Sequence, residues 1–462
     1  MVHINPKSSS REQWGDKLGF IMATAGAAVG LGNIWRFPYV CGENGGGAFI
    51  LAYIICIALI SGPILVAEVL IGRASGQGSG SAFISLTPKG ESKIWRFIGV
   101  VGVLISFLLV SYYSIVAGWT LEYLWQALQG HLSSFSGDNS QKFFDNFMAS
   151  DSRQIFWHIF LTCMTAVILL RGINKGIEKL SKILMPVLLI LLFSLAVFGI
   201  SVEWASHENP SSLLDLKSIK FLFVPDWSKF TMDSVFQALG QAAFSLSIAV
   251  GTLIAYGSYL DRKENIVNLG SMVIAMDTMV ALLAGVLIFP IVFASGLSPS
   301  QGTGLIFVTL PNLFSGMPNG DLLVILFYLL IFFAALTSMI SLLEPGITHL
   351  IDEMNSTRPK ACMYVAIASS ALGVVWILVG SLQQEFLFFN IDKIVSNFLI
   401  PLEALGISIF ASWVLDKVIS KEQLSNAGEK FFNIWFFIVK WLCPIAILII
   451  LVKGLISQDM GG

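Results

Sequence analysis

The sequence predicts an all-α, polytopic membrane protein. The 462-residue chain is 55% hydrophobic and 12% charged, with a mean hydropathy of +0.79, which is too apolar for a soluble domain. Apolar runs of about 20 residues, the length that crosses a bilayer as a helix, recur along the whole chain. The five cysteines lie in apolar runs without a CxxC pair, so neither a disulfide framework nor a zinc site is indicated.

Eleven membrane spans are expected from these runs. They cover residues 16–41, 46–72, 98–128, 154–171, 177–200, 231–261, 265–295, 321–352, 361–381, 388–416 and 431–455. Lys and Arg gather before the first span and in every second loop after it, whereas the alternate loops are poorer in them. The positive-inside rule therefore predicts a cytoplasmic N-terminus, and an odd number of spans predicts a C-terminus outside.

The remaining segments are read as loops. We expect no cleavable signal peptide, because a polar N-terminal stretch leads directly into a long span. Two long outer loops are expected at 129–153 and 201–230, where Asp, Ser, Asn and Pro mix. A third, 296–321, contains the apolar run 305–311, which is too short to span and predicts a re-entrant lid.

The first span contains a predicted break. Gly26, Gly30 and Gly32 lie within seven residues, and each weakens a helix by roughly 1 kcal/mol relative to alanine. Unwound backbone is tolerated in a membrane where it faces protein or a polar cavity. We therefore expect carbonyls here to bind a cation and the amides of the next half-helix to bind an anion. The alternative is that the glycines merely allow tight helix packing.

The sixth span carries a second interruption, at residues 240–251, where glycines flank a run of small and polar residues. The first and sixth spans each open a block of five. Because five is an odd number of spans, the second block of five enters the membrane from the opposite side and is inverted relative to the first. Paired interruptions of this kind predict an inverted-repeat transporter with its site at the midplane.

Several motifs closely resemble the neurotransmitter:sodium symporter family, in its bacterial amino-acid branch. They are Arg11-Glu12-Gln13-Trp14, Gly30-Leu31-Gly32-Asn33-Ile34-Trp35-Arg36-Phe37-Pro38, Glu43-Asn44-Gly45-Gly46-Gly47-Ala48-Phe49, Gly62-Pro63, Glu68, Gly72-Arg73, Tyr112-Tyr113, Arg171-Gly172-Ile173, Ser245-Leu246-Ser247 and Thr337-Ser338. The resemblance covers nearly the whole chain.

The resemblance implies the leucine-transporter fold, a 5+5 inverted repeat plus one extra helix, in the bacterial inner membrane. It implies uptake of amino acids or related amines coupled to inward sodium flow. The expected divisions are a cytoplasmic segment 1–15, repeats 16–200 and 231–416, an outer loop 201–230, and a last helix with the C-terminus at 417–462. We expect no nucleic-acid partner, and a monomer is expected to suffice.

Two sodium sites are implied by the same resemblance. The first would use the carbonyl of Ala28, the side chains of Asn33 and Ser245, and the substrate carboxylate. The second would use the carbonyls of Gly26, Val29 and Ala334 with the hydroxyls of Thr337 and Ser338. From the residues alone, these two hydroxyls could equally bond back to the preceding helical turn.

Asp277 is an acid deep in a predicted span, where an ionised carboxylate is costly unless it meets a cation. The resemblance aligns it with the family's asparagine ligand of the first sodium, beside the chloride position. The neighbours of that position would be Tyr53, Gln241 and Ser245. We expect this fixed carboxylate to replace chloride, which would then not be required. The alternative is a protonated acid bonded to a carbonyl, and proton exchange is compatible with either.

Two glutamates in the spans are assigned supporting roles. The resemblance places Glu68 against the unwound sixth span, where it would satisfy freed backbone groups. Glu344, which precedes Pro345, is expected only to bond the backbone that the proline leaves unpaired.

The implied substrate site holds a zwitterion. Amides of Leu31 and Gly32 with the hydroxyl of Tyr113 would take the carboxylate, and carbonyls of Ala28, Phe244 and Ser245 the amino group. The side-chain pocket would consist of Leu109, Tyr113, Val116, Phe244, Ser247, Val250, Ser338 and Leu342. This lining is apolar and uncharged, so it favours neutral hydrophobic or aromatic amino acids. Taken singly, each aromatic residue is equally explained by helix packing.

The resemblance also implies gates. Arg36 and Asp392 resemble the outer pair, with Phe244 as a lid, and Arg11 and Asp352 resemble the inner pair, supported by Trp14 and Tyr259. Gly176 and Pro186 reproduce a spacing that permits local unwinding of the fifth span.

The rival classes are an intramembrane enzyme, a sodium channel and a non-transporting sensor. The sequence has no HExxH or GxSxG motif and no clustered histidines, which disfavours the enzyme.

Overall fold

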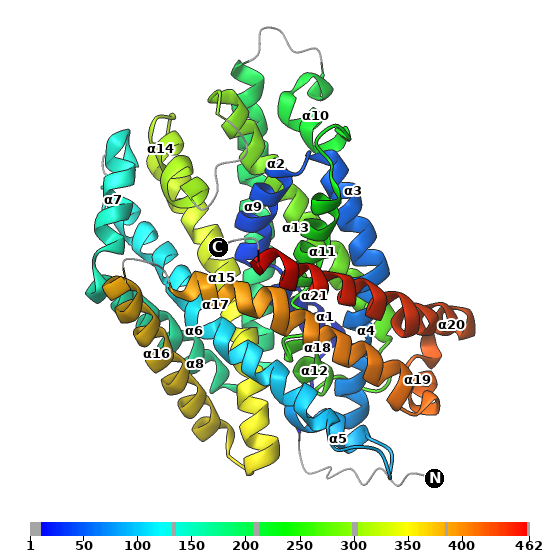
Figure 1. Cartoon of the computed structure of the whole chain (residues 1–462). Helices are drawn as coiled ribbons and strands as arrows, with labels where there is room; N and C mark the ends of the chain where they lie inside the picture. The colour runs from blue at the N-terminus through cyan, green and yellow to red at the C-terminus, as the bar shows by residue number, and fades with distance from the viewer. Residues whose placement is uncertain (1–10, 132–134, 207–211, 298–303, 384–386, 460–462) are drawn as a thin grey trace.

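Helices make up the described part of the computed structural model, residues 11–131, 135–206, 212–297, 304–383 and 387–459 (Figure 1). Nine helices within these ranges are long and apolar enough to cross a membrane. They are Gly47–Ser75, Trp95–Leu128, Asp151–Leu169, Ile173–Ser206, Ile266–Ala294, Gly320–Met354, Arg358–Gly380, Ile391–Val414 and Glu429–Gly454. Each lies within a few residues of a predicted span.

Two further predicted spans are interrupted. The first consists of α1 (Lys17–Ala28) and a second half from the π-helical turn η1 (Gly32–Arg36) through α2 (Phe37–Glu43), bent by 51°. The predicted sixth span consists of α11 (Met232–Ser245) and α12 (Thr252–Gly257), neither long enough to cross a membrane alone. The total of eleven spans therefore stays a prediction, whereas both predicted breaks are present.

The other helices divide as follows. The second span is α3 (Gly47–Cys56), η2 (Ile57–Ser61) and α4 (Gly62–Ser75). The long spans are α6 (Trp95–Leu128), α8 (Asp151–Leu169), η4 (Ile173–Glu178) with α9 (Lys179–Ser206), α13 (Ile266–Ala294), α15 (Gly320–Met354) and α16 (Arg358–Gln383). The last two spans are α17 (Leu387–Ile394), η7 (Val395–Leu399), α18 (Ile400–Ile409) and η8 (Phe410–Val414), then α20 (Glu429–Phe437), η10 (Ile438–Leu442) and α21 (Cys443–Asp459). Short helices are α5 (Ser79–Leu86), α7 (Asp138–Met148), α10 (Lys217–Phe223) and α19 (Lys417–Gln423).

The N-terminus of α1 is set by Asp16, whose carboxylate accepts a hydrogen bond from the Gly19 amide at 2.8 Å. The Lys182 ammonium, 2.8 Å away, and this amide hold the pKa of Asp16 below its usual value. The helix ends at Ala28, because Val29 has extended backbone angles (φ −74°, ψ 104°). The break therefore lies within the glycine-rich stretch that predicted it.

The broken first span lies inside the bundle. Its half α1 packs against α13, α15, α9 and α12, and α15 in turn packs along α6. The view of Figure 1 shows α1 and α12 near the middle of the molecule. The fold thus brings the two interrupted spans together at its centre.

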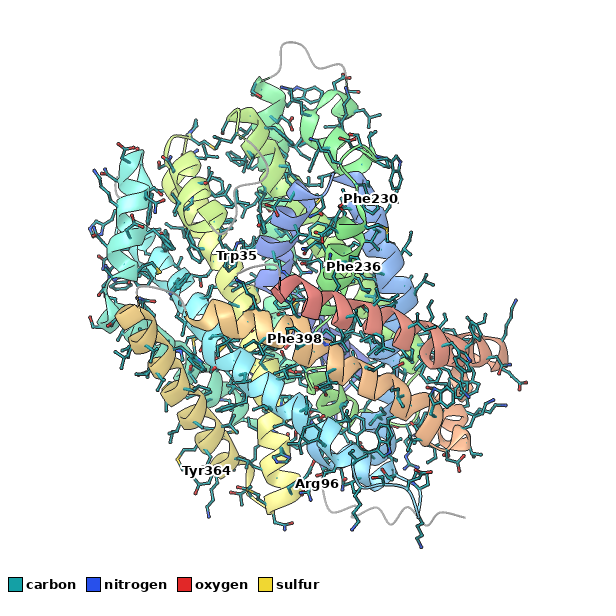
Figure 2. The ribbon with its side chains drawn as sticks, in the orientation of Figure 1. Trp35, Arg96, Phe230, Phe236, Tyr364 and Phe398 are labelled. Carbon is teal, nitrogen blue, oxygen red and sulfur yellow. The ribbon has the colours of Figure 1, made fainter. Side chains whose placement is uncertain are left out.

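Apolar side chains cover the outside of the bundle as well as its interior (Figure 2). Tyr364 on α16, Ile190 on α9 and Phe437 on α20 are 56%, 65% and 63% exposed. An apolar exterior on long helices is the surface that lipid covers.

The predicted lid at 305–311 is a short helix that does not span the membrane. It comprises η6 (Leu305–Thr309) and α14 (Leu310–Ser315). Tyr123 of α6 donates to the Phe307 carbonyl and Tyr328 of α15 to the Ile306 carbonyl, each at 2.7 Å. These bonds hold the segment against two long helices. Residues 298–303 of this loop lie outside the described ranges.

Candidate functional site

A small cavity of about 40 Å³ lies between the two helix breaks. It is lined by Ala27, Ala28, Gly30, Leu31, Gly32, Leu109, Tyr113, Ala243, Phe244, Ser247, Ile248, Val250, Ser338, Leu342 and Ile400. The lining contains hydroxyls and backbone groups but no charged side chain. It is thus suited to a ligand whose charges are met by main-chain dipoles.

Most residues expected around a substrate line this cavity, with two exceptions. Val116 lines a separate cavity on the outer side, and Ser245 belongs to a polar cluster behind the break. Sequence reasoning missed Ile248 and Ile400. Ile248 lies inside the predicted interruption of the sixth span, so its position in the sequence indicated that it could line the cavity. Ile400 lies in an ordinary apolar run, and nothing in the sequence indicated that it would line the cavity.

Glycines let other helices approach the first break closely. A Cβ on Gly30 would lie 2.5 Å from Ser338 Oγ and 3.1 Å from the Tyr113 hydroxyl, and one on Gly32 would lie 2.9 Å from the Phe244 ring. The Leu31 amide donates to the Tyr113 hydroxyl at 3.3 Å. The glycines therefore have both of the expected roles. They lie where the helix is broken, and they allow side chains of neighbouring helices to pack closely against the first span.

A polar cluster centred on Asp277 lies beside the cavity. Asn33 Nδ2 donates to Asp277 Oδ1 at 2.7 Å, and Ser245 Oγ lies 2.9 and 2.8 Å from the two carboxylate oxygens. The Tyr53 hydroxyl is 3.2 Å from Oδ2. The cluster is fully buried, and it joins both broken spans to α3 and α13.

Gln241 binds the backbone of the first break. Its Nε2 donates to the Gly32 carbonyl at 3.1 Å, and its Oε1 is buried without a partner among the described residues. Gln241 lies one helical turn before Ser245 of the Asp277 cluster. Its expected place beside a chloride position stays a prediction.

The expected second sodium ligands also meet. Ser338 Oγ lies 3.5 Å from the Val29 carbonyl, and a Cβ on Gly26 would be 3.1 Å from Thr337 Cβ. Thr337 Oγ1 donates to the carbonyls of Phe333 and Ala334 in the preceding turn, at 3.1 and 3.0 Å. A hydroxyl that donates its proton to a carbonyl keeps its lone pairs, so this bonding remains compatible with a cation ligand.

No group of three or more His, Cys, Asp or Glu side chains that could hold a metal ion occurs in the described ranges. The two clusters instead offer amide, hydroxyl, carbonyl and carboxylate oxygens. Such hard oxygen donors suit an alkali cation and not zinc or another transition metal.

The second break is held by Glu68 and by strained backbone. Glu68 Oε2 accepts from the Ala249 amide at 3.1 Å, and Ser247 Oγ donates to the Ala27 carbonyl at 2.9 Å. Ser247 and Ala249 have φ of +50° and +57°, a region that costs non-glycine residues energy. Sequence reasoning missed the neighbouring Glu403, a fully buried acid in α18. Its position inside a predicted span was the available signal.

On the outer side, Arg36 and Asp392 line a cavity of about 270 Å³ with Phe244 at its floor. The Arg36 guanidinium lies 4.8 Å from the centre of the Phe244 ring, and Asp392 Oδ1 accepts from Tyr112 at 2.7 Å. No ion pair within 4 Å joins Arg36 to Asp392 in the part of the chain that the structure describes. The two residues of the expected outer pair therefore line the same cavity, but they do not form the ion pair that would close it.

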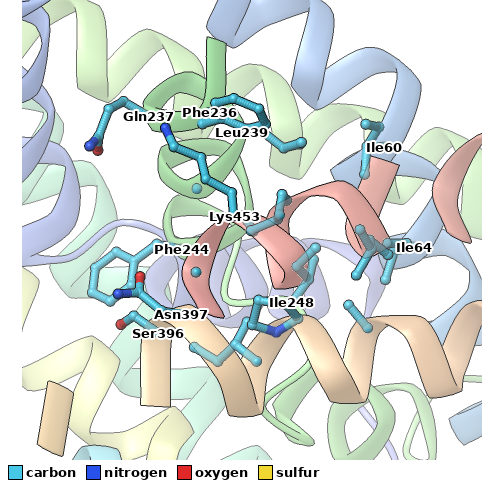
Figure 3. A pocket seen from close by; sticks show the side chains of 18 of the residues that line it. Ile60, Ile64, Phe236, Gln237, Leu239, Phe244, Ile248, Ser396, Asn397 and Lys453 are labelled. Carbon is cyan, nitrogen blue, oxygen red and sulfur yellow. The ribbon is translucent and has the colours of Figure 1, made fainter. Parts of the chain in front are cut away.

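A neighbouring cavity of about 240 Å³ lies between α11, η7, α18 and α21 (Figure 3). Ile60, Ile64 and Ile248 form part of its apolar lining, and Lys453 and Gln237 lie at its polar side. Lys453 forms an ion pair with Asp233. Both outer cavities reach Phe244, so the ring separates them from the small cavity between the breaks.

The expected inner pair is formed at the end of the bundle where α1 begins. Arg11 Nη1 lies 2.8 Å from Asp352 Oδ1, and Nη2 donates to Ser258 Oγ at 2.7 Å. The guanidinium packs over the Tyr259 ring at 4.8 Å. Trp14 Nε1 donates to the Tyr256 carbonyl at 3.0 Å. The chain before α1 is thus bound to the end of the sixth span and to α15.

Glu344 differs from its expectation. It forms a bidentate pair with Arg358 at 2.9 and 2.7 Å and accepts from the Tyr259 hydroxyl at 2.7 Å. It does not serve the backbone near Pro345, because α15 runs through that proline. The fully buried carboxylate is paired with the Arg358 guanidinium, whose side chain is 14% exposed. Sequence reasoning missed this partner because Arg358 lies after a loop.

The fifth span is wound in this structure. Gly176 lies in the π-helical turn η4, and Pro186 lies inside the continuous α9. A Cβ on Gly176 would lie 2.3 Å from the Ile168 carbonyl, so the glycine permits close contact with α8. The unwinding expected of this pair stays a prediction.

Comparison with known proteins gives consistent results along the whole chain. The model of the sodium:neurotransmitter symporter family matches residues 11–152 and 146–460. An uncharacterized sodium-dependent transporter of Bacillus subtilis, YhdH, is 35% identical over 96% of this chain and 98% of its own. Another from Haemophilus influenzae is 33% identical over 98% of this chain and 100% of its own.

A solved structure agrees in fold. The crystal structure of MhsT in complex with L-phenylalanine matches with a TM-score of 0.85 and 36% identity, covering 96% of this chain and 100% of MhsT. The expected leucine-transporter fold is thereby confirmed. The chain therefore belongs to the sodium:neurotransmitter symporter family and is a multi-pass, sodium-dependent membrane transporter.

Proposed function

We propose that this protein is a sodium-coupled symporter that imports neutral hydrophobic or aromatic amino acids by alternating access and does not require chloride. The observation that carries the proposal is the buried Asp277 cluster, placed beside an uncharged cavity between two broken spans.

Two sodium ions are proposed, one on each side of the first break. Asn33, Ser245 and Asp277 offer oxygens on one side, and Thr337 and Ser338 offer hydroxyls on the other. A substrate carboxylate at the amides of Leu31 and Gly32 would complete the first site. Sodium and substrate would then bind cooperatively, since each supplies part of the other's site.

The Asp277 carboxylate supports chloride independence. It supplies a fixed negative charge where the first sodium would otherwise need a mobile anion. Three neutral donors surround it, from Asn33, Ser245 and Tyr53. No cation faces it among these contacts, so its charge is available to a bound ion.

The cavity lining supports a neutral substrate with an apolar side chain. Leu109, Val250 and Leu342 would contact that side chain, and Ser247 and Ser338 supply the polar contacts. A charged side chain would have no countercharge in this lining. L-Phenylalanine is the ligand in the structure of MhsT, to which this chain is similar.

The proposed mechanism uses the inner contacts as a gate. Arg11, Asp352 and Tyr259 hold the cytoplasmic side closed, while the outer cavity reaches down to Phe244. Surface-accessible ion pairs contribute about 0–1 kcal/mol each, which allows them to open during a cycle. The proposed protein lies in the bacterial inner membrane, with its N-terminus in the cytoplasm and its C-terminus outside. Its two inverted repeats cover residues 16–200 and 231–416.

The test is uptake of labelled L-phenylalanine into proteoliposomes. We expect accumulation with an inward sodium gradient, equally in sodium chloride and sodium gluconate, and none with potassium. Leucine and tyrosine should compete, whereas lysine and glutamate should not. Binding without accumulation would indicate a sensor, and sodium flux without a fixed substrate ratio would indicate a channel. Either result would contradict the proposal.

A further inference from the structure

Three lysines gather against aromatic rings where the end of the tenth span meets the first half of the last span. Lys440 Nζ lies 4.2 Å from the centre of the Trp413 ring, with the rings of Trp441 and Phe436 at 5.8 and 5.7 Å. Lys417 Nζ lies over the same Phe436 ring at 4.9 Å. We name Trp413, Lys417, Phe436, Lys440 and Trp441 the lysine-aromatic patch.

Two ammonium groups share one ring in this patch. Both lie within 5.7 Å of the centre of Phe436, where their like charges repel. Neither forms an ion pair within 4 Å in the part of the chain that the structure describes. The third lysine, Lys421, is paired with Glu429 at 3.1 Å. The patch therefore carries two uncompensated positive charges.

The patch faces outward beside the end of the tenth span. Trp413 and Trp441 are 54% and 48% exposed, and Trp413 lies one residue before the end of its span. Trp413 Nε1 donates to the Lys440 carbonyl at 3.4 Å, which places Lys440 beside that end. Trp and Lys at the end of a span are typical of the headgroup region.

An apolar stripe continues from the patch along the last span. Beyond Trp441, Ile445 and Leu448 follow helical spacing with it and are 55% and 48% exposed. This stripe is suited to an acyl chain, whereas the two ammonium groups above it are suited to a phosphate. In Figure 1, α19 and α20 lie together at the right-hand edge, apart from the centre of the bundle.

The same end of the molecule carries the cytoplasmic contacts. Arg73 at the end of α4 donates to Gln423 Oε1 at 2.6 Å and to the Glu264 carbonyl at 2.6 Å. The neighbouring Tyr259 carbonyl accepts from the Trp14 amide. The patch therefore lies at the same end as the chain before α1, which the positive-inside rule assigns to the cytoplasm.

We propose that the lysine-aromatic patch is a binding site for an anionic phospholipid of the inner leaflet, such as phosphatidylglycerol. The phosphate would lie between the ammonium groups of Lys417 and Lys440 and relieve their repulsion, and an acyl chain would lie along the stripe. The rings hold the lysines in place, since a cation over an aromatic face is stabilised without a hydrogen bond.

The test is a titration of the full-length, detergent-purified protein with phosphatidylglycerol and phosphatidylcholine, with bound lipids counted by native mass spectrometry. We expect tighter binding of phosphatidylglycerol to the wild type. A lysine near an anionic headgroup contributes about fivefold in affinity, so K417Q/K440Q should weaken that binding by about 25-fold. K417R/K440R should retain most of it.

The matched control is K89Q/K93Q, which removes two exposed lysines of a loop at the same end that have no ring contact in the described structure. It should change the affinity less than twofold, and thermal melting in detergent verifies that each variant is folded. Equal affinity for the two lipids, an unaffected K417Q/K440Q variant, or equal weakening in the control would overturn the proposal. Displacement of phosphatidylglycerol by an equal concentration of glycerol 3-phosphate would also overturn it. That result would mean that the site binds a water-soluble phosphate as well as it binds the lipid.

Discussion

Replacing Asp277 with asparagine tests the charge at the centre of the proposed sodium site. Asparagine has nearly the same shape, so the contacts with Asn33, Ser245 and Tyr53 could be kept while the negative charge is removed. Two unit charges about 4 Å apart interact by about 4 kcal/mol at an effective dielectric constant of 20. A loss of this size corresponds to about 1,000-fold in sodium affinity, and relaxation of the neighbours will reduce it.

We therefore expect D277N to raise the sodium concentration for half-maximal uptake by at least about tenfold in sodium gluconate. Chloride should restore part of the loss, because it can supply the missing charge. The assay is sodium-dependent uptake of labelled phenylalanine into proteoliposomes, in chloride and in gluconate. D277E, which keeps the charge, is the control and should remain indifferent to chloride.

Unchanged, chloride-indifferent uptake by D277N would refute this reasoning. Asparagine resembles a protonated aspartic acid, so such a result would favour the alternative in which Asp277 is neutral. Chloride dependence of the wild type would refute it equally.

Three further substitutions test the packing around the site. G30A should abolish substrate binding, since its Cβ would lie 2.5 Å from a serine hydroxyl, whereas G240A on α11 should bind normally because nothing lies within 4 Å of its Cβ. A249G should raise the melting temperature, because glycine removes a cost of about 1 kcal/mol at φ +57°, and A249V should lower it. E344Q should lower the melting temperature because it removes the charge that faces the Arg358 guanidinium at a fully buried position. E353Q, in an exposed ion pair, should lower it less and cost less than about 1 kcal/mol. Equal effects within any of these three pairs would contradict the packing described here.

The helix breaks could be predicted from sequence because local chemistry determines them. The glycines of the first span and the small and polar residues of the sixth weaken a helix wherever the fold places them. Motif resemblance then identified Asn33, Ser245 and Asp277, which come from three spans and meet in one cluster. Their spacing along the chain alone could not have predicted that these three side chains are in contact.

The parts that could not be predicted depend on packing between distant helices. Ile400 lines the cavity because its helix α18 packs against α6 and α4, and the pairing of Glu344 with Arg358 crosses a loop. The hydrogen bond of Gln241 to the Gly32 carbonyl likewise joins two spans that are far apart in the chain.

The central claim is that sodium and an uncharged amino-acid side chain are bound together between the two breaks. Equilibrium binding of labelled L-phenylalanine to the purified protein, in sodium and in potassium, tests it most directly. The account predicts saturable binding in sodium, and none in potassium at the same ionic strength. Binding of equal affinity in both salts would contradict it.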